Sequence, residues 1–209
     1  ETLGSTTLIM TDKTGTLTEA NMKLVGIYTL PDLLFSKSGV HNADAETNDI
    51  LSMALTNIDV LVENPEDSIK NWLFKGKPFE VNIAKTARDN GIDISSLRKS
   101  KSNNILIPFN STHKFSVSRD EKSFIVMGAP DVLLARSKIS KDEFAKIESH
   151  INNFSTEGKR LIAVARMDLN NNNELSTDAV KDLSFIGILA FHDPVRNNVP
   201  EAIKKIESF

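Results

Sequence analysis

The organisation of this chain is decided by one seven-residue stretch, Asp12-Lys13-Thr14-Gly15-Thr16-Leu17-Thr18. The stretch follows an apolar, β-branched run over residues 6–11, which predicts a buried strand. An acid at the end of such a strand, followed by a turn through Gly15, lies at the carboxyl edge of a sheet, where open α/β sheets bind ligands. The stretch therefore predicts that the Asp12 carboxylate is presented to a ligand.

The composition of the 209 residues is that of a globular protein with a core, at 40% hydrophobic and 25% charged residues. The net charge of -3 gives no bulk attraction to nucleic acid, and we expect no nucleic-acid partner. Because there is no cysteine, disulfides and thiolate metal sites are excluded. No apolar run approaches the ~20 residues of a membrane-spanning helix. Since the chain does not begin with Met, we expect a soluble fragment of a longer protein.

In the rest of the chain, the apolar patterns predict groups of helices that alternate with groups of strands adjacent in sequence. Helical spacing of apolar residues predicts helices over residues 45–61, 69–73, 78–90, 131–136, 141–154 and 199–208. Alternating or continuous apolar runs predict strands over residues 22–28, 105–109, 114–119, 123–127, 161–165 and 183–191. We expect loops at Pro31, over residues 36–44 and over residues 168–178.

This pattern predicts an α/β chain whose middle has an α+β texture. We expect an inserted domain over residues 29–184, with a mainly antiparallel sheet flanked by helices. Residues 1–28 and 185–209 would lie together as parts of a second, Rossmann-like domain. The last of these ranges would form the return from the insertion.

The Asp12 stretch has the residue types needed to accept a phosphoryl group. A carboxylate can attack phosphorus and form an aspartyl-phosphate, which splits one difficult displacement into two steps. The turn amides after Asp12 and the Thr16 hydroxyl would donate hydrogen bonds to the phosphate. The Asp12 carboxylate and a nearby backbone carbonyl would hold Mg²⁺, which prefers oxygen ligands. A bare surface turn is the alternative, because Asp, Thr and Gly are common turn residues.

The same stretch resembles the phosphorylation motif of P-type ATPases, the cation pumps of the haloacid-dehalogenase-like superfamily. The resemblance covers essentially the whole chain and implies a catalytic site of Asp12, Lys13, Thr14 and Thr16. Asp12 would be the phosphorylated residue, and the backbone carbonyl of Thr14 would be a second Mg²⁺ ligand. Related phosphatases usually carry a second Asp where Thr14 stands. Because Thr14 cannot readily activate a water, we expect the phosphoenzyme to persist, as a pump requires.

The first segment that resembles an adenine-binding motif of the family is Gly76-Lys77-Pro78-Phe79-Glu80. It is similar to the pattern Gly-x-Pro-Thr-Glu, with Phe79 in place of the usual Thr. The resemblance implies that Glu80 accepts a hydrogen bond from the exocyclic amine of adenine. The alternative is a helix that begins at Pro78 and carries an acid in its first turn, where the helix dipole favours it.

The second such segment is Pro108-Phe109-Asn110-Ser111-Thr112-His113-Lys114. It is similar to the family pattern Pro-Phe-(Asn/Ser)-Ser…Lys. The resemblance implies that Phe109 stacks on the adenine ring and that Ser111 and Lys114 belong to the same nucleotide pocket. Packing of Phe109 in the core is the alternative.

The third segment, Met127-Gly128-Ala129-Pro130, resembles the family pattern Lys-Gly-Ala-Pro. The resemblance implies that Gly128 lets the backbone approach the adenine closely. Met127 stands where the family has a lysine that reaches into the pocket. Because that positive charge is missing, we expect weaker ATP binding than in relatives with Lys.

Two further segments resemble parts of the family that handle phosphate and connect the domains. Gly158-Lys159-Arg160 resembles a Gly-x-Arg strand start, which implies that the Arg160 guanidinium reaches the phosphates. Asp193-Pro194-Val195-Arg196 resembles the hinge segment Asp-Pro-x-Arg. We expect Asp193 and Arg196 to pair with each other or to organise the hinge. For Arg160, the alternative is an exposed charge at the start of a strand. For Asp193 to Arg196, the alternative is a plain turn at the end of a strand.

The resemblance implies an ion-translocating ATP hydrolase that works with ATP and Mg²⁺ at the cytoplasmic face of a membrane. The calcium, sodium/potassium and proton pump branches are favoured over heavy-metal pumps. The partners would be the remainder of the same polypeptide: the actuator, the second part of the phosphorylation domain and the transmembrane helices. We therefore expect this chain alone to bind ATP with little or no turnover. Two alternatives stay open, a haloacid-dehalogenase-like phosphatase with a large cap and a non-catalytic ATP-sensing module.

Overall fold

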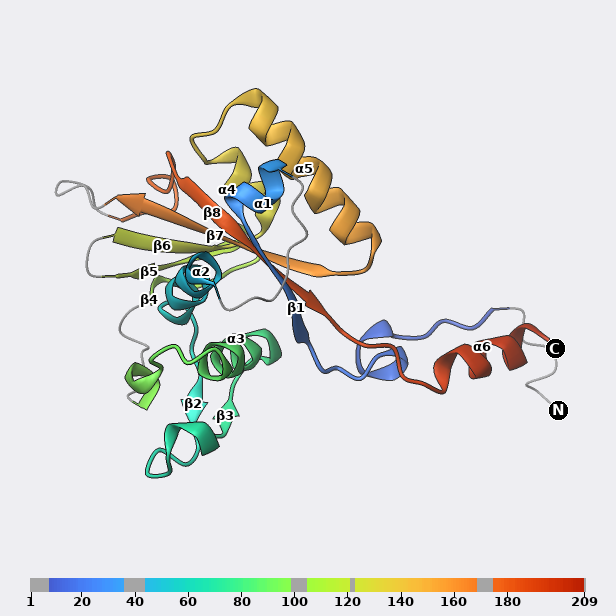
Figure 1. Ribbon diagram of the computed structural model, residues 1–209. Coiled ribbons are helices and arrows are strands. Elements are labelled where there is room, and N and C mark those ends of the chain that lie inside the picture. Colours follow the sequence, from blue (N-terminus) through green and yellow to red (C-terminus); the bar gives the residue numbers. More distant parts are fainter. Residues whose placement is uncertain (1–7, 36–43, 99–104, 121–122, 169–174, 209) are drawn as a thin grey trace.

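The centre of the molecule is a six-stranded sheet in the order β1-β8-β7-β6-β5-β4, in which every neighbouring pair runs antiparallel (Figure 1). The computed structural model describes residues 8–35, 44–98, 105–120, 123–168 and 175–208 of the chain. The strands of this sheet are β1 (Lys23–Thr29), β4 (Ile105–Ile107), β5 (Phe115–Arg119), β6 (Ser123–Gly128), β7 (Arg160–Asp168) and β8 (Ser184–His192).

Both faces of the sheet are apolar. Successive residues of a strand point to opposite sides, so neighbouring side chains enter different clusters. In β6, Ile125 and Met127 join one hydrophobic cluster, whereas Val126 between them joins the other. In β8, Phe191 faces the first cluster and Ile188 faces the second. A sheet buried on both faces explains why its strands appear in the sequence as nearly continuous apolar runs.

Helices cover the two faces (Figure 1). On the first face, α2 (Ala45–Leu55) and α3 (Pro78–Asp89) contribute buried side chains to one cluster. On the second face lie α1 (Leu30–Phe35), α4 (Pro130–Ala135) and α5 (Lys141–Thr156). The result is a layer of helices on each side of the sheet.

The sequence specifies where several of these helices begin. Both α3 and α4 have Pro in their first turn, where its missing N–H is not needed. The α5 helix begins with a capping box, in which Ser140 Oγ accepts a hydrogen bond from the Glu143 N–H and the Glu143 carboxylate accepts one from the Ser140 N–H. At α2, the Asp44 carboxylate accepts a hydrogen bond from the Thr47 N–H, which lowers the pKa of Asp44.

A small two-stranded unit follows α2. Its Trp72 side chain is buried, and Nε1 donates a hydrogen bond to the Asp67 carbonyl at 3.1 Å. The unit therefore packs a large aromatic side chain against the first cluster. The short elements of this region are β2 (Leu61–Val62), a 3₁₀ turn (Ile69–Asn71), β3 (Phe74–Lys75) and a second 3₁₀ turn (Ser95–Arg98).

Residues 8–18 and α6 (Val199–Glu207) form an arm that extends from the ends of β1 and β8 (Figure 1). This arm adds little to the two clusters. The α6 side chains Ile203 and Ile206 are exposed, as are Leu8 and Met10, whose exposed fractions are 71% and 87%. The described helices include none that is long and apolar enough to cross a membrane.

The predicted fold class is confirmed, because the mainly antiparallel sheet is flanked by helices. Two local predictions are wrong. Residues 8–11, the described part of the predicted strand over residues 6–11, form no strand and are exposed, since no described strand lies beside them. Pro31 lies in α1 and not in a loop, because Pro suits the first turn of a helix. There the Asp32 carboxylate accepts the Thr29 N–H at 2.9 Å.

Other predicted elements differ from the structure mainly in their bounds. The helix predicted over residues 45–61 ends at Leu55, and the one over residues 69–73 is a 3₁₀ turn. Of the loops predicted over residues 36–44 and 168–178, residues 36–43 and 169–174 lie outside the described residues, and Asp168 ends β7. Because β8 pairs with β7 of the expected insertion as well as with β1, strands on both sides of the expected domain boundaries share one sheet. The division into domains stays a prediction.

Candidate functional site

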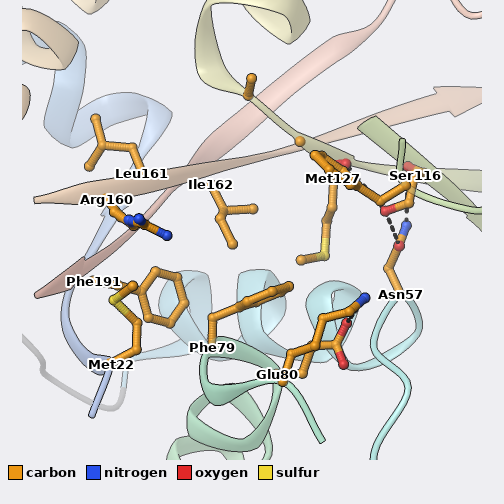
Figure 2. Close-up of a pocket in the computed structure, with 14 residues that line it drawn as sticks. Met22, Asn57, Phe79, Glu80, Ser116, Met127, Arg160, Leu161, Ile162 and Phe191 are labelled. Atoms are coloured by element: carbon orange, nitrogen blue, oxygen red, sulfur yellow. Dashed lines mark hydrogen bonds and ion pairs between the residues drawn. The ribbon is translucent and has the colours of Figure 1, made fainter. Parts of the chain in front are cut away.

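A cavity of about 480 Å³ opens between the beginning of α3 and the sheet. Its size is typical of small-molecule sites, which span about 300–1,000 Å³. Figure 2 shows the side chains around it. The lining residues are Met22, Asn57, Lys77, Phe79, Glu80, Phe109, Ser116, Met127, Gly128, Ala129, Arg160, Leu161, Ile162 and Phe191.

Most of these side chains come from α3 and from strands β5, β6, β7 and β8. Phe79 and Glu80 belong to the first turn of α3, Gly128 ends β6, and Arg160 begins β7. The sheet order places β6, β7 and β8 side by side, and Arg160 lies opposite Phe191 of β8. The site therefore depends on the sheet register and on where α3 begins.

The wall of the cavity is largely apolar. The Phe79 ring lies edge-on to the Phe191 ring, with 6.3 Å between centroids and 76° between planes. Figure 2 shows Met127 and Ile162 facing the Phe79 ring across the cavity. An apolar slot with aromatic walls suits a flat ring system, since aromatic rings prefer edge-on or offset contacts.

Glu80 is the acidic group in this wall, and only 5% of the residue is exposed. Its Oε1 atom lies 3.4 Å from Lys77 Nζ. Burial raises the pKa of the Glu80 carboxyl above its ordinary value. The Lys77 charge and hydrogen bond lower the pKa of Glu80 and so oppose this rise. The Asp59 carboxylate raises the pKa of Glu80 further, whereas a hydrogen bond from the Asp59 backbone lowers it.

A buried polar group that the sequence analysis did not identify also lines the cavity. The Asn57 side chain donates from Nδ2 to the Ile125 carbonyl at 2.8 Å, and its Oδ1 atom accepts a hydrogen bond from Ser116 Oγ at 2.7 Å. Asn57 follows the end of α2 and carries no motif of its own. Its position just beyond an amphipathic helix is a weak signal, so only the tertiary structure reveals it.

Five residues predicted to bind a nucleotide line the cavity, namely Glu80, Phe109, Met127, Gly128 and Arg160. Of these, Phe109 and Arg160 are exposed, whereas Glu80, Met127 and Gly128 are buried. The lining therefore combines a buried floor with exposed side chains that a ligand could contact from solvent.

Ser111 and Lys114 are not lining residues, and both are exposed. The Lys114 backbone has a φ of 58°, and its carbonyl accepts the Ala129 N–H at 2.9 Å. A Cβ atom at Gly128 would collide with this carbonyl and with the Phe115 backbone. The close approach of β5 therefore already requires glycine at position 128, whatever occupies the cavity.

The Asp12 stretch forms a tight π-type turn over Lys13–Leu17 in which Gly15 has a φ of 85°. The four residues predicted to form the catalytic site, Asp12, Lys13, Thr14 and Thr16, are all exposed on this turn. Among the residues that the structure describes, none donates a hydrogen bond to the Asp12 carboxylate. The turn therefore presents an accessible carboxylate.

Asp193 and Arg196, which the sequence analysis predicts to form a hinge, bind this turn and the residues after it rather than each other. Thr18 Oγ1 donates a hydrogen bond to Asp193 Oδ2 at 2.5 Å, and the Asn21 N–H donates to Oδ1 at 3.0 Å. Arg196 donates from Nε to the Thr18 carbonyl and from Nη2 to the Gly15 carbonyl, each at 3.0 Å. The described ranges contain no ion pair between Asp193 and Arg196. Both side chains tie the outgoing segment of the chain to the returning one.

The Asp12 turn lies on the arm (Figure 1), and residues 12–18 are not among those that line the cavity. Its Asp12 carboxylate and Thr14 carbonyl are oxygen donors of the kind that Mg²⁺ takes, and they fit a metal that is completed by water and phosphate oxygens. Within the described ranges, no cluster of three or more His, Asp or Glu side chains could hold a metal ion by itself.

Comparison with known proteins matches most of the sheet and the cavity to one family. Residues 47–198 match the family model of the P-type ATPase, cytoplasmic domain N. Calcium-transporting ATPase 1 of Saccharomyces cerevisiae is 28% identical over 99% of this chain, and calcium-transporting ATPase 1 of Lactococcus lactis is 31% identical over 97%. Potassium-transporting ATPase alpha chain 2 of Cavia porcellus is 26% identical over 100%. The chain spans 24–25% of the length of these relatives. It belongs to the family of P-type ATPases.

Proposed function

We propose that the chain binds ATP in the cavity and that the γ-phosphoryl group of ATP is transferred to Asp12 during cation transport. The observation that supports this most directly is the cavity itself. It joins Glu80, Phe109, Met127, Gly128 and Arg160, which come from four separate segments of the sequence, around a slot of about 480 Å³. Its apolar walls and the buried Glu80 carboxyl suit a base that carries an exocyclic amine.

Four of the lining residues have distinct parts in this proposal. Phe109 and Phe79 supply aromatic surface for the base, and the buried Glu80 carboxylate accepts a hydrogen bond from its amine. Arg160, exposed at the beginning of β7, binds the phosphates, for which a guanidinium has the right geometry. The base is thereby held in the slot while the phosphates extend towards solvent.

At the Asp12 turn, a carboxylate oxygen of Asp12 forms a bond to the γ-phosphorus while the bond from that phosphorus to the bridging oxygen breaks, and ADP leaves. The backbone amides of the turn and the Thr16 hydroxyl donate hydrogen bonds to the phosphoryl oxygens. Lys13 adds positive charge. Mg²⁺, held by the Asp12 carboxylate and the Thr14 carbonyl, would neutralise phosphate charge. Because residues 12–18 do not line the cavity, transfer requires the two parts to approach each other.

Calorimetry of ATP binding to this chain tests the first half of the proposal. Glu80→Ala and Phe109→Ala should each weaken ATP binding by about fivefold to 150-fold, since each removes a contact worth roughly 1–3 kcal/mol. Asp12→Asn should leave the affinity unchanged, because Asp12 lies outside the cavity. A chain that binds no ATP, or that binds it equally well without Glu80 and Phe109, would contradict the proposed site.

Phosphoryl transfer can be tested in a chimera in which the whole of this chain replaces the matching segment of the Lactococcus lactis relative. Incubation with ATP labelled at the γ-phosphate should give an acid-stable, hydroxylamine-sensitive phosphoprotein. The Asp12→Asn chimera should incorporate no label. Equal labelling of both chimeras would show that Asp12 is not the acceptor.

A further inference from the structure

The balance of charge around the cavity is unusual for a site that receives a polyanion. Its described lining carries three charged side chains, Lys77, Glu80 and Arg160. The lysine expected at position 127 is replaced by Met127, and Lys114 does not line the cavity. Within the described residues, Lys77 is the cation that forms an ion pair with the buried Glu80 carboxylate, which would face an anionic ligand.

Lys77 and Glu80 form a defined pair at the beginning of α3. Lys77 is the residue that precedes the helix, and its Nζ atom lies 3.4 Å from Glu80 Oε1. The exposed fraction of the side chain is 65% for Lys77 and 7% for Glu80. The lysine thus reaches from solvent to a carboxylate that is almost fully enclosed. Phe79, in the same first turn of α3, contributes an apolar ring to the wall of the cavity.

We propose that Lys77 is a positioning residue for the base: it keeps the Glu80 carboxylate ionised and oriented in the cavity, so that the cavity selects bases with an exocyclic amine. This inference rests on the proposed ATP site. An ionised carboxylate can only accept hydrogen bonds, whereas a protonated one can also donate. The pair therefore favours the amine of adenine over the carbonyl of hypoxanthine at the same ring position.

The groups around Glu80 explain why a partner is needed. Burial disfavours the charged form and raises the pKa of Glu80, and the Asp59 carboxylate acts in the same direction. The Lys77 ammonium and the Asp59 backbone N–H act in the opposite direction, as does the N-terminal end of the α3 dipole. Arg160 also lines the cavity. Of these groups, Lys77 is the side-chain cation in contact with the carboxylate.

The direct test is a titration of the Glu80 carboxyl carbon by NMR in the absence of nucleotide. The Lys77→Met variant removes the charge and keeps an unbranched side chain, and Lys77→Arg restores a cation. The pKa of Glu80 should rise by about half a unit to one unit in Lys77→Met, since a partly exposed lysine is lost, and should stay near the wild-type value in Lys77→Arg. Lys85→Met is the matched control, because Lys85 is exposed on the same helix and does not line the cavity.

Nucleotide selection is the second readout. As pH falls through the raised pKa of Glu80, the carboxylate protonates and ATP binding weakens. In Lys77→Met this weakening should begin at a higher pH than in the wild type, because loss of the Lys77 charge raises the pKa of Glu80 further. The preference for ATP over ITP should shrink in the same range. Lys85→Met should follow the wild-type profile.

The outcomes separate the two proposals. If the wild-type chain binds neither ATP nor ITP, the proposed nucleotide site is wrong. If the wild type prefers ATP while Lys77→Met keeps both the wild-type pH profile and the wild-type pKa of Glu80, only the role of Lys77 is wrong. A rise in the pKa of Glu80 together with a reduced preference for ATP, both reversed by Lys77→Arg, is the expected result.

Discussion

The cavity and the Asp12 turn are held in place by different forces. The cavity lies against a sheet that is packed on both faces, and the sheet residues Phe115, Val164 and Phe191 are fully buried. The Asp12 turn lies on the arm, where the Thr18 side chain is the buried group and polar contacts to residues 193–196 hold the backbone. Apolar packing fixes the first region, and hydrogen bonds fix the second.

This difference suggests how one chain can separate ligand binding from chemistry. A close-packed core resists small displacements, so the cavity keeps its shape. Hydrogen bonds at a partly exposed turn are individually worth only about 0.5–1.5 kcal/mol, or about 1.5–3 kcal/mol when one partner is charged. A segment joined to the sheet by a few such bonds can change its direction at modest cost. The proposed transfer to Asp12 needs such a motion.

The largest expected effect contrasts one side chain from each region. Phe115→Ala should destabilise the chain by about 3–5 kcal/mol, because Phe115 is fully buried and a cavity would remain. Ile206→Ala on α6 should change the free energy of unfolding by less than about 0.5 kcal/mol, because half of Ile206 is exposed. Denaturation by urea would measure both values. Similar losses in the two variants would show that the arm shares the core.

A smaller effect is expected when the polar contacts of the arm are broken. Asp193→Ala removes the hydrogen bonds to Thr18 Oγ1 and to the Asn21 N–H. Since the acceptor is charged, the local opening free energy should fall by about 1.5–3 kcal/mol, and amide exchange at Asn21 should accelerate about tenfold to a hundredfold. Exchange in β6 and β7 should not change.

The control for this experiment is Asp178→Ala, which removes an exposed acid outside the helices and strands. It should leave exchange at Asn21 unaltered. If Asp193→Ala instead accelerated exchange throughout the sheet, the contacts of Asp193 would belong to the global core and the contrast between the two regions would fail.

Most of the fold could be predicted from the sequence because its strands and helices have strong local signals. The apolar run of β8 and the Pro78 start of α3 appear where the sequence places them. The strand predicted over residues 6–11 has an equally apolar pattern, but its described residues are exposed. An apolar pattern shows that a segment could be buried in a sheet. It does not show whether another strand is present for that segment to pair with.

The cavity residues were predictable to the extent that they carried motifs. Glu80 and Phe109 lie in recognisable segments, and both line the cavity. Asn57 has no motif, and its buried contacts to Ile125 and Ser116 join residues that are 59 or more positions apart. Such contacts depend on the way α2 packs on the sheet, which local patterns do not encode.

The smallest expected effect concerns Met127, which lines the cavity and so belongs to the closely packed region of the molecule. Met127 is only 3% exposed, and Figure 2 shows its side chain pointing into the cavity. A lysine has a similar unbranched stem and can extend its ammonium towards water or a ligand while the stem stays in apolar contact. Met127→Lys should therefore tighten ATP binding by about fivefold, close to 1 kcal/mol, through attraction to the phosphates.

Adenosine separates this attraction from changes in the slot, because it has the same base and no phosphate. Met127→Lys should leave adenosine affinity within about twofold of wild type, and so should the uncharged control Met127→Leu for both ligands. An unchanged ATP affinity in a folded Met127→Lys chain would mean that the phosphates do not pass near position 127. An equal gain in affinity for adenosine would mean that the lysine acts on the base or on Glu80. The affinity of the cavity would then depend on the contacts of its walls with the base rather than on attraction to the phosphates.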